Sequence, residues 1–289
     1  MGFSLFRIVE KRELAEGVDQ FVVEAPEVAR SAKPGQFVIV RITGRGERIP
    51  LTIADKDPEA GTITLMVQRV GKTTYHLSCF EEGNAIRDLV GPLGRPTEIK
   101  RWGRVVAVGG GLGLAPIHHI SKGLKEAGNH LTVIMGFRSK SLVFWEDRMA
   151  LIADRVIVTT NDGSYGVKGL VTGPLKELLE KKEVDAVICA GPVPMMKAVA
   201  ELTRPYGIPT VASLNPIMVD GTGMCGACRV RVGGEVKFAC VDGPEFDAHQ
   251  VDFEELQNRL KMFRKYEEIA VRRFQEKHCG CRGERWERR

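Results

Sequence analysis

Three cysteines stand close together near the carboxyl end of the sequence, in the pattern Cys225-x2-Cys228-x11-Cys240. The chain has seven cysteines in all, and clustering of this kind in a reducing compartment indicates metal ligands before disulfides. The spacing matches three of the four ligands of a plant-type [2Fe–2S] site, whose first ligand stands five residues before the second. Asp220 occupies that first position. The segment 215–250 is therefore expected to wrap around a cluster held by Asp220, Cys225, Cys228 and Cys240.

Two other interpretations of this loop stay open. A zinc knuckle also accepts three cysteines, but zinc sites usually pair Cys-x2-Cys with a second close pair, which this loop lacks. Asp220 precedes a glycine, so it is also typical of an ordinary turn. The glycines at 221, 223 and 226 allow the loop to turn backbone N–H groups inward toward a cluster. We therefore expect iron–sulfur rather than zinc, with the aspartate as the fourth ligand.

The first 99 residues are rich in short runs of β type. Residues 21–24, 35–42 and 61–67 are rich in β-branched side chains and are bounded by turn residues. Long helical periods do not separate them. This spacing predicts an antiparallel barrel or sandwich over residues 1–99.

The pattern changes near residue 100, where apolar strands begin to alternate with helical segments. Fully apolar strands in such an alternation are typical of a doubly wound parallel sheet. We expect this domain over residues 100–214, with strands at 104–108, 131–136, 156–160 and 186–190.

Glycines gather where the first of these strands meets its helix, in the run Gly-Gly-Gly-Leu-Gly at 109–113. Glycines at such a turn let a diphosphate approach the backbone and the helix N-terminus. The run does not match the strict dinucleotide fingerprint, so its position between strand and helix supports it most. Arg138 is otherwise a solvated loop residue, and Gly191-Pro192 a turn that starts a helix. The expected nicotinamide contacts lie at strand carboxyl ends: Gly110, Gly111, Leu112, Gly113, Arg138, Cys189, Gly191, Pro192 and Met195.

Two segments of the expected barrel could hold a second anionic cofactor. Residues 48–53 combine a cation, a fixed turn and a hydroxyl beside a strand, and residues 71–74 offer a nest of N–H and hydroxyl groups for a diphosphate. Neither segment is decisive alone. The candidate contacts are Arg48, Pro50, Leu51, Thr52, Ile53, Gly71, Lys72, Thr73 and Thr74.

Composition and the two ends of the chain narrow the class of protein. The 289 residues carry a net charge of +5 without a concentrated basic face, which argues against nucleic-acid binding. No apolar run approaches the ~18 residues of a membrane span, and the first residues do not form an export signal, so a cytoplasmic protein is expected. In residues 251–289 we expect one amphipathic helix capped by Asp252. A basic tail should follow it, in which Cys279 and Cys281 could touch a partner's metal or, as we expect, be exposed thiols.

Taken together, these motifs resemble the ferredoxin-reductase-like flavoproteins, and among them the electron-transfer subunits. The resemblance implies FAD on the barrel, NAD(H) on the parallel sheet and a [2Fe–2S] cluster in the cysteine loop. It adds Gln68, Val70 and Asp162 to the expected cofactor contacts. It covers about residues 5–250 and is most specific at 48–53, 109–116, 160–169, 189–196 and the cysteine loop.

Two groups of electron-transfer subunits compete within this family. The subunits of dihydroorotate dehydrogenase typically have Arg-Pro-x-Ser at the flavin and four cysteines at the cluster. Here Ile49 stands where that arginine would be, Arg48 comes one residue earlier, and Asp220 replaces the first cysteine. The small subunits of NADH-dependent reduced ferredoxin:NADP+ oxidoreductases, which are electron-bifurcating transhydrogenases, are similar to this sequence at both points. The resemblance favours this second group. It implies a heterodimer with a larger flavin and iron–sulfur subunit, through which ferredoxin and NADP(H) would be handled.

The expected chemistry follows from what each cofactor can carry. A nicotinamide exchanges two electrons as hydride and the cluster exchanges one, so a flavin has to stand between them. Two rivals stay open: a regulatory or structural subunit with a degenerate cofactor fold, and a standalone reductase. The glycines and cluster ligands argue against the first, and the C-terminal helix and basic tail argue mildly against the second.

Overall fold

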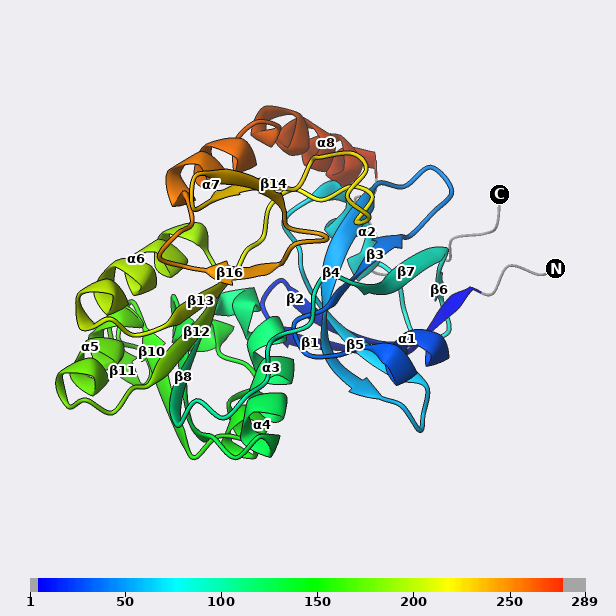
Figure 1. Cartoon of the computed structure of the whole chain (residues 1–289). Coiled ribbons are helices and arrows are strands. Elements are labelled where there is room, and N and C mark those ends of the chain that lie inside the picture. The colour runs from blue at the N-terminus through cyan, green and yellow to red at the C-terminus, as the bar shows by residue number, and fades with distance from the viewer. Residues whose placement is uncertain (1–4, 278–289) are drawn as a thin grey trace.

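The computed structural model describes residues 5–277 and begins with a nearly closed antiparallel barrel (Figure 1). Its strands follow the order β6-β1-β2-β5-β4-β3-β7, and every neighbouring pair is antiparallel. The large side chains Phe21, Ile53 and Leu65 are fully buried inside it, which confirms the expected barrel. The elements are β1 (Phe6–Ala15), β2 (Val18–Glu24), α1 (Pro26–Ser31), β3 (Phe37–Arg41), β4 (Arg48–Asp57), β5 (Thr62–Gln68), α2 (Lys72–Ser78), β6 (Ala85–Ile86) and β7 (Asp88–Leu93).

A second sheet follows, in the order β11-β10-β9-β8-β12-β13-β16. Its strands are parallel except β16, which pairs antiparallel with β13 at the edge. This confirms the expected doubly wound sheet. Its elements are β8 (Arg104–Gly110), α3 (Leu114–Glu126), β9 (His130–Phe137), α4 (Glu146–Ala150), β10 (Arg155–Thr160), β11 (Val167–Lys168), α5 (Thr172–Glu180), β12 (Ala186–Ala190), α6 (Val193–Thr203), β13 (Thr210–Ser213) and β16 (Glu245–Asp247), with short 3-10 turns η1 (Gly111–Gly113), η2 (Lys140–Leu142) and η3 (Arg204–Tyr206).

The strand order reverses beside β8. From β8 the chain winds outward through β9 and β10, and it then returns to place β12 on the other side of β8. The helices divide between the two faces of the sheet, and α3 lies on the face that meets the barrel (Figure 1). Open sheets of this kind bind ligands at the carboxyl ends of the strands next to such a reversal, so the fold directs attention to the ends of β8 and β12.

The chain ends in a small hairpin and two helices. The hairpin is β14 (Arg229–Val232) with β15 (Glu235–Phe238), and the helices are α7 (Phe253–Leu260) and α8 (Arg264–Lys277). The expected cap is present, because the Asp252 side chain accepts a hydrogen bond from the Glu255 N–H at 2.8 Å.

The expectation of one continuous amphipathic helix is wrong. The chain turns at 261–263 and the apolar stripe breaks there, leaving Phe263 half exposed. Beyond the break, α8 packs on α2, where the rings of Phe274 and His76 lie 5.4 Å apart. Cys279 and Cys281 lie outside the described residues. Within residues 5–277, none of the helices has the length and apolar character that crossing a membrane requires.

Candidate functional site

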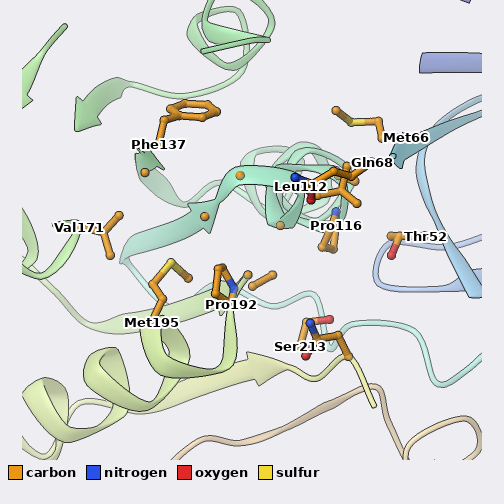
Figure 2. A pocket seen from close by; sticks show the side chains of 18 of the residues that line it. Thr52, Met66, Gln68, Leu112, Pro116, Phe137, Val171, Pro192, Met195 and Ser213 are labelled. Carbon is orange, nitrogen blue, oxygen red and sulfur yellow. The ribbon is translucent and has the colours of Figure 1, made fainter. Parts of the chain in front are cut away.

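A cleft of about 880 Å³ lies between the barrel and the parallel sheet (Figure 2). Thr52 and Gln68 come from barrel strands on one side, and Phe137 and Met195 stand on the other. Its walls lie at the carboxyl ends of β8, β9, β12 and β13, where the fold predicts a ligand. The cleft therefore joins the two regions in which the sequence predicts separate cofactors.

The turn between β8 and α3 depends on glycine. A Cβ on Gly113 would lie 2.1 Å from the carbonyl oxygen of Ala190 at the end of β12. Gly111 adopts a φ of +51°, in the left-handed region that favours glycine. The turn can thus lie directly against β12, which brings the start of α3 to the rim of the cleft.

Twelve of the predicted cofactor contacts line this cleft. Their binding of FAD or NAD(H) stays a prediction, but the fold gathers them from five separate segments of the chain. They are Pro50, Leu51, Thr52, Gln68, Gly110, Gly111, Leu112, Gly113, Arg138, Gly191, Pro192 and Met195.

Two predicted contacts have side chains that point elsewhere. Ile53 is fully buried in the barrel core, whereas its neighbour Thr52 lines the cleft. Cys189 is also fully buried, and burial raises the pKa of its thiol to about 12. Both side chains serve packing, so any contact with a cofactor would come from the backbone.

The predicted diphosphate nest at residues 71–74 already has an anionic partner. The Glu47 carboxylate accepts a hydrogen bond from the Thr73 hydroxyl and forms an ion pair with Lys72 at 3.4 Å. The Thr74 hydroxyl accepts from the Gly71 N–H at 2.9 Å. This start of α2 therefore carries donors that suit an anion, and Glu47 occupies two of them.

Three further predicted residues lie outside the cleft lining. Arg48 and Val70 are exposed at the ends of β4 and β5. Asp162 is exposed in the loop after β10, where its carboxylate accepts from the Ser164 N–H at 2.9 Å and hydroxyl at 2.7 Å. These bonds lower the pKa of Asp162 below its usual value. Its role toward a nucleotide stays a prediction.

The four predicted cluster ligands fall into two pairs. The Sγ atoms of Cys228 and Cys240 lie 3.2 Å apart and are both buried. This separation is longer than the about 2.05 Å of a disulfide bond, so the two thiols are not bonded to each other. It is shorter than two metal–thiolate bonds of about 2.3 Å, so one metal ion could contact both sulfur atoms. Cys225 is exposed, and its N–H donates to the Asp220 carboxylate at 2.8 Å. Among the described residues these side chains do not close into a metal-binding group of three or more.

Asp220 shapes the loop as well as presenting an acid. Its second carboxylate oxygen accepts from the Thr222 N–H at 2.7 Å, and the two N–H bonds hold the pKa of Asp220 below its usual value. This is the turn geometry expected of an Asp-Gly sequence. A carboxylate oxygen has two lone pairs, so each oxygen keeps one for a metal. Both interpretations of Asp220 are therefore compatible with one conformation, and the thiol-rich loop fits an iron–sulfur cluster.

The cysteine loop packs against the barrel strand that carries one wall of the cleft. Gly221, at a φ of +78°, approaches so closely that a Cβ there would lie 2.7 Å from atoms of Ile39 and Leu93. Ile39 pairs across the sheet with Pro50, which lines the cleft. Met218, two residues before Asp220, lines the cleft as well. The loop and the cleft are thus immediate neighbours.

Several cleft residues are missing from the sequence-based set. The strand-end rule would have found those at 213–218 had β13 been assigned, and Phe37 and Met66 come from the barrel. Phe137 ends β9, Phe144 precedes α4 and Pro244 precedes β16. Among the missing residues are Phe37, Met66, Phe137, Phe144, Ser213, Leu214, Asn215, Pro216, Met218 and Pro244.

Known proteins match this chain in sequence and in structure. Residues 215–252 match the iron–sulfur cluster binding domain of dihydroorotate dehydrogenase B. The chain is 49% identical over 273 residues to the dihydroorotate dehydrogenase B (NAD(+)) electron transfer subunit homolog of Thermotoga maritima, over 94% of this chain and 96% of that protein. It is 32% identical over 260 residues to the dihydroorotate dehydrogenase B (NAD(+)) electron transfer subunit of Geobacillus thermodenitrificans, over 87% of this chain and 99% of that protein.

A solved structure extends the comparison. A chain from the structure of NADH-dependent reduced ferredoxin-NADP oxidoreductase, studied for flavin-based electron bifurcation, is 49% identical. It superposes with a TM-score of 0.88 over 94% of this chain and 99% of that chain. The fold, the cysteine loop and these full-length matches agree: this chain belongs to the ferredoxin-reductase-like family of electron-transfer subunits that includes those of dihydroorotate dehydrogenase B and their homologues.

Proposed function

We propose that this chain is the electron-transfer subunit of an electron-bifurcating ferredoxin:NADP+ oxidoreductase, carrying electrons between NAD(H), FAD and a [2Fe–2S] cluster. One observation carries the proposal: the cysteine loop lies against the barrel strands that form one wall of the interdomain cleft. The barrel (1–99) would bind FAD, residues 100–214 NAD(H) and residues 215–250 the cluster. A bound FAD would exchange hydride with the nicotinamide and single electrons with the cluster.

The residues of the cleft have distinct tasks in this proposal. Pro50 to Thr52 and Gln68 form the wall against which a flavin ring would lie, since they come from the barrel side of the cleft and β4 pairs directly with β3, which the cysteine loop contacts. The glycines at 110–113 would accommodate the nucleotide diphosphate at the start of α3. Arg138, exposed at the carboxyl end of β9, would contact its ribose end.

The cluster ligands support the bifurcating group over the dihydroorotate group. Asp220 replaces the cysteine that four-cysteine loops carry, and its position between two loop N–H groups still leaves lone pairs for iron. Cys228 and Cys240 form one ligand pair, and Asp220 with Cys225 forms the other. The 49% identity to a chain of a bifurcating oxidoreductase supports the same assignment.

The second candidate is the electron-transfer subunit of a dihydroorotate dehydrogenase. The names of the sequence relatives and the matching iron–sulfur domain favour it. Both candidates place a larger flavoprotein beside this chain, and they differ in what that partner oxidises. In the bifurcating assembly, ferredoxin and NADP(H) would react on the partner.

The test is anaerobic expression of the chain with and without the product of the neighbouring gene. Iron and FAD in a ratio near two to one, with flavin bleached by NADH, are expected for the chain alone. Co-purification of a larger flavin and iron–sulfur protein that reduces NADP+ supports the bifurcating assignment. A partner that oxidises dihydroorotate supports the second candidate. Zinc in place of iron, or a colourless chain, would refute both candidate functions.

A further inference from the structure

Two consecutive histidines on α3 bridge the parallel-sheet domain to the barrel. His118 Nδ1 lies 3.0 Å from the carbonyl oxygen of Ala54, and His119 Nδ1 lies 3.1 Å from that of Ile53. Both side chains are 4% exposed. Histidines are seldom buried this deeply unless a partner satisfies them, so the two contacts define their role.

The barrel strand is built to receive both histidines. Consecutive carbonyls of a regular strand point in opposite directions, yet these two both accept hydrogen bonds from one helix. A bulge explains it: β4 skips a residue against β5 at Ala54, between the pairs Ile53–Leu65 and Asp55–Thr64. Pairing of β3 with β4 ends at Thr52. The two carbonyls therefore face α3, and its imidazoles are their donors.

A third contact ties the same two domains together. Trp145 Nε1 donates to the Gln20 side chain of β2 at 3.1 Å, and the Trp145 ring lies 4.8 Å from that of His118. Trp145 adopts a φ of +59°, which is strained for a residue with a side chain. The surrounding structure holds that conformation while the indole reaches across to the barrel.

We propose that His118, His119 and Trp145 are positioning residues that set the distance between the two walls of the cleft. This inference rests on the proposed function. The histidines lie two and three residues after Pro116, and their acceptors lie one and two residues after Thr52; both Pro116 and Thr52 line the cleft (Figure 2). Pro116 lies within one helical turn of both histidines. A displacement of the histidines along β4 therefore shifts the side of the cleft that holds Pro116 relative to the barrel side that holds Thr52.

Hydrogen bonds are directional, so they fix the position of α3 along β4, whereas apolar packing alone does not. Leucines at 118 and 119 would preserve buried volume but leave two buried carbonyls without donors, and they would allow α3 to slide along β4. Asparagine carries its amide nitrogen on Cγ, as histidine carries Nδ1, so it can donate from the same place. It is also a poorer helix former than leucine, so any rescue by asparagine cannot come from helix propensity.

The test compares the H118L/H119L and H118N/H119N variants of the full chain, purified anaerobically with its flavin and cluster. NADH bleaching of the flavin is followed by stopped flow over a range of NADH concentrations. The leucine pair should lower the limiting rate per bound flavin about tenfold or more, toward the about 100-fold that a 1 Å misplacement can cost. The NADH concentration that gives half of the limiting rate should change far less. The asparagine pair should restore most of the limiting rate.

Matched tryptophan variants cover the case in which the leucine pair does not fold. Trp145→Phe removes the donor to Gln20 together with part of the indole ring, and it should slow bleaching. Trp102→Phe is the control, because Trp102 Nε1 is buried without a hydrogen-bond partner among the described residues. A W145F rate equal to that of W102F and wild type would overturn the inference. So would a leucine pair with full flavin and the wild-type rate, or an asparagine pair as slow as the leucine pair.

Hydrogen–deuterium exchange separates this inference from the proposed function. The leucine pair should lose protection of amides in 50–56 and 112–124, and the asparagine pair should keep it. If wild type binds flavin but is not bleached by NADH, the proposed function fails. In that case the inference is judged by hydrogen–deuterium exchange alone. Equal amide protection in the leucine pair and in wild type would refute it.

Discussion

Replacing His119 by asparagine should flatten the loss of stability that acid causes in this chain. Burial lowers the pKa of His119 from 6.5 to about 4, so the folded protein holds the imidazole neutral. The unfolded chain takes up a proton first as pH falls from 6.5, and the folded state follows only near pH 4. The stability that the neutral imidazole contributes is therefore fully present at neutral pH. It is lost as pH falls from about 6.5 to about 4.

The two pKa values set the size of the effect. Between pH 7 and pH 5, the unfolded chain gains about 2 kcal/mol relative to the folded state from His119 alone. Charged groups around the histidine pair come from three elements: Asp55 and Lys56 on β4, Lys122 on α3 and Arg148 on α4. All remain in the variant, so they cancel when it is compared with wild type.

The assay is urea unfolding of wild type and His119→Asn at pH 7 and pH 5, followed by tryptophan fluorescence. Asparagine does not titrate and keeps the donor to Ile53, so the variant should gain about 2 kcal/mol on wild type as the pH is lowered. His130→Asn, at an exposed histidine, is the matched control. Parallel pH profiles for wild type and His119→Asn would refute the assignment of a neutral, buried imidazole.

Three further changes test other parts of the molecule. Burial raises the pKa of Glu245 from 4.5 to about 7, so the stability that its protonated form contributes is lost as pH rises from about 4.5 to 7. Glu245→Gln should therefore stabilise the chain at pH 8 by about 3 kcal/mol in urea unfolding, and no gain would contradict a raised pKa at this carboxyl. Gly113→Ala sets a Cβ against the Ala190 carbonyl and should lower the affinity for NADH measured by titration, whereas wild-type affinity would show that the turn can shift. Asp220→Ala removes two loop hydrogen bonds and a candidate ligand, so bound iron should fall; full iron occupancy would rule out both roles.

The barrel, the parallel sheet and the cysteine loop could be predicted because each has a local signature. Alternating β-branched runs, apolar strands followed by Gly109–Gly113 and the spacing of Cys225, Cys228 and Cys240 all depend on near neighbours in sequence. The same reasoning identified the cleft residues that follow β8, β9 and β12, since ligands lie at strand ends.

Features made by distant contacts were beyond this reasoning. His118 and His119 look like polar helix residues, and only the bulge at Ala54 on another domain gives them buried partners. The break between α7 and α8 also depends on a contact distant in sequence, because α8 turns away to pack on α2. Ile53 shows the limit of motif reasoning, since the motif identifies a strand but not which face each residue takes.

Strand β16 has a consequence for how the chain must be made. It belongs to the last third of the sequence, yet it covers the edge of the parallel sheet by pairing with β13 through Ser213 and Glu245. An uncovered strand edge is a template for aggregation. During synthesis the sheet stays open at β13 until the cysteine segment has left the ribosome, and a chain truncated after residue 214 would keep that sticky edge permanently. The segment that carries the predicted cluster ligands thus also shields the sheet edge from pairing with a second copy of the chain.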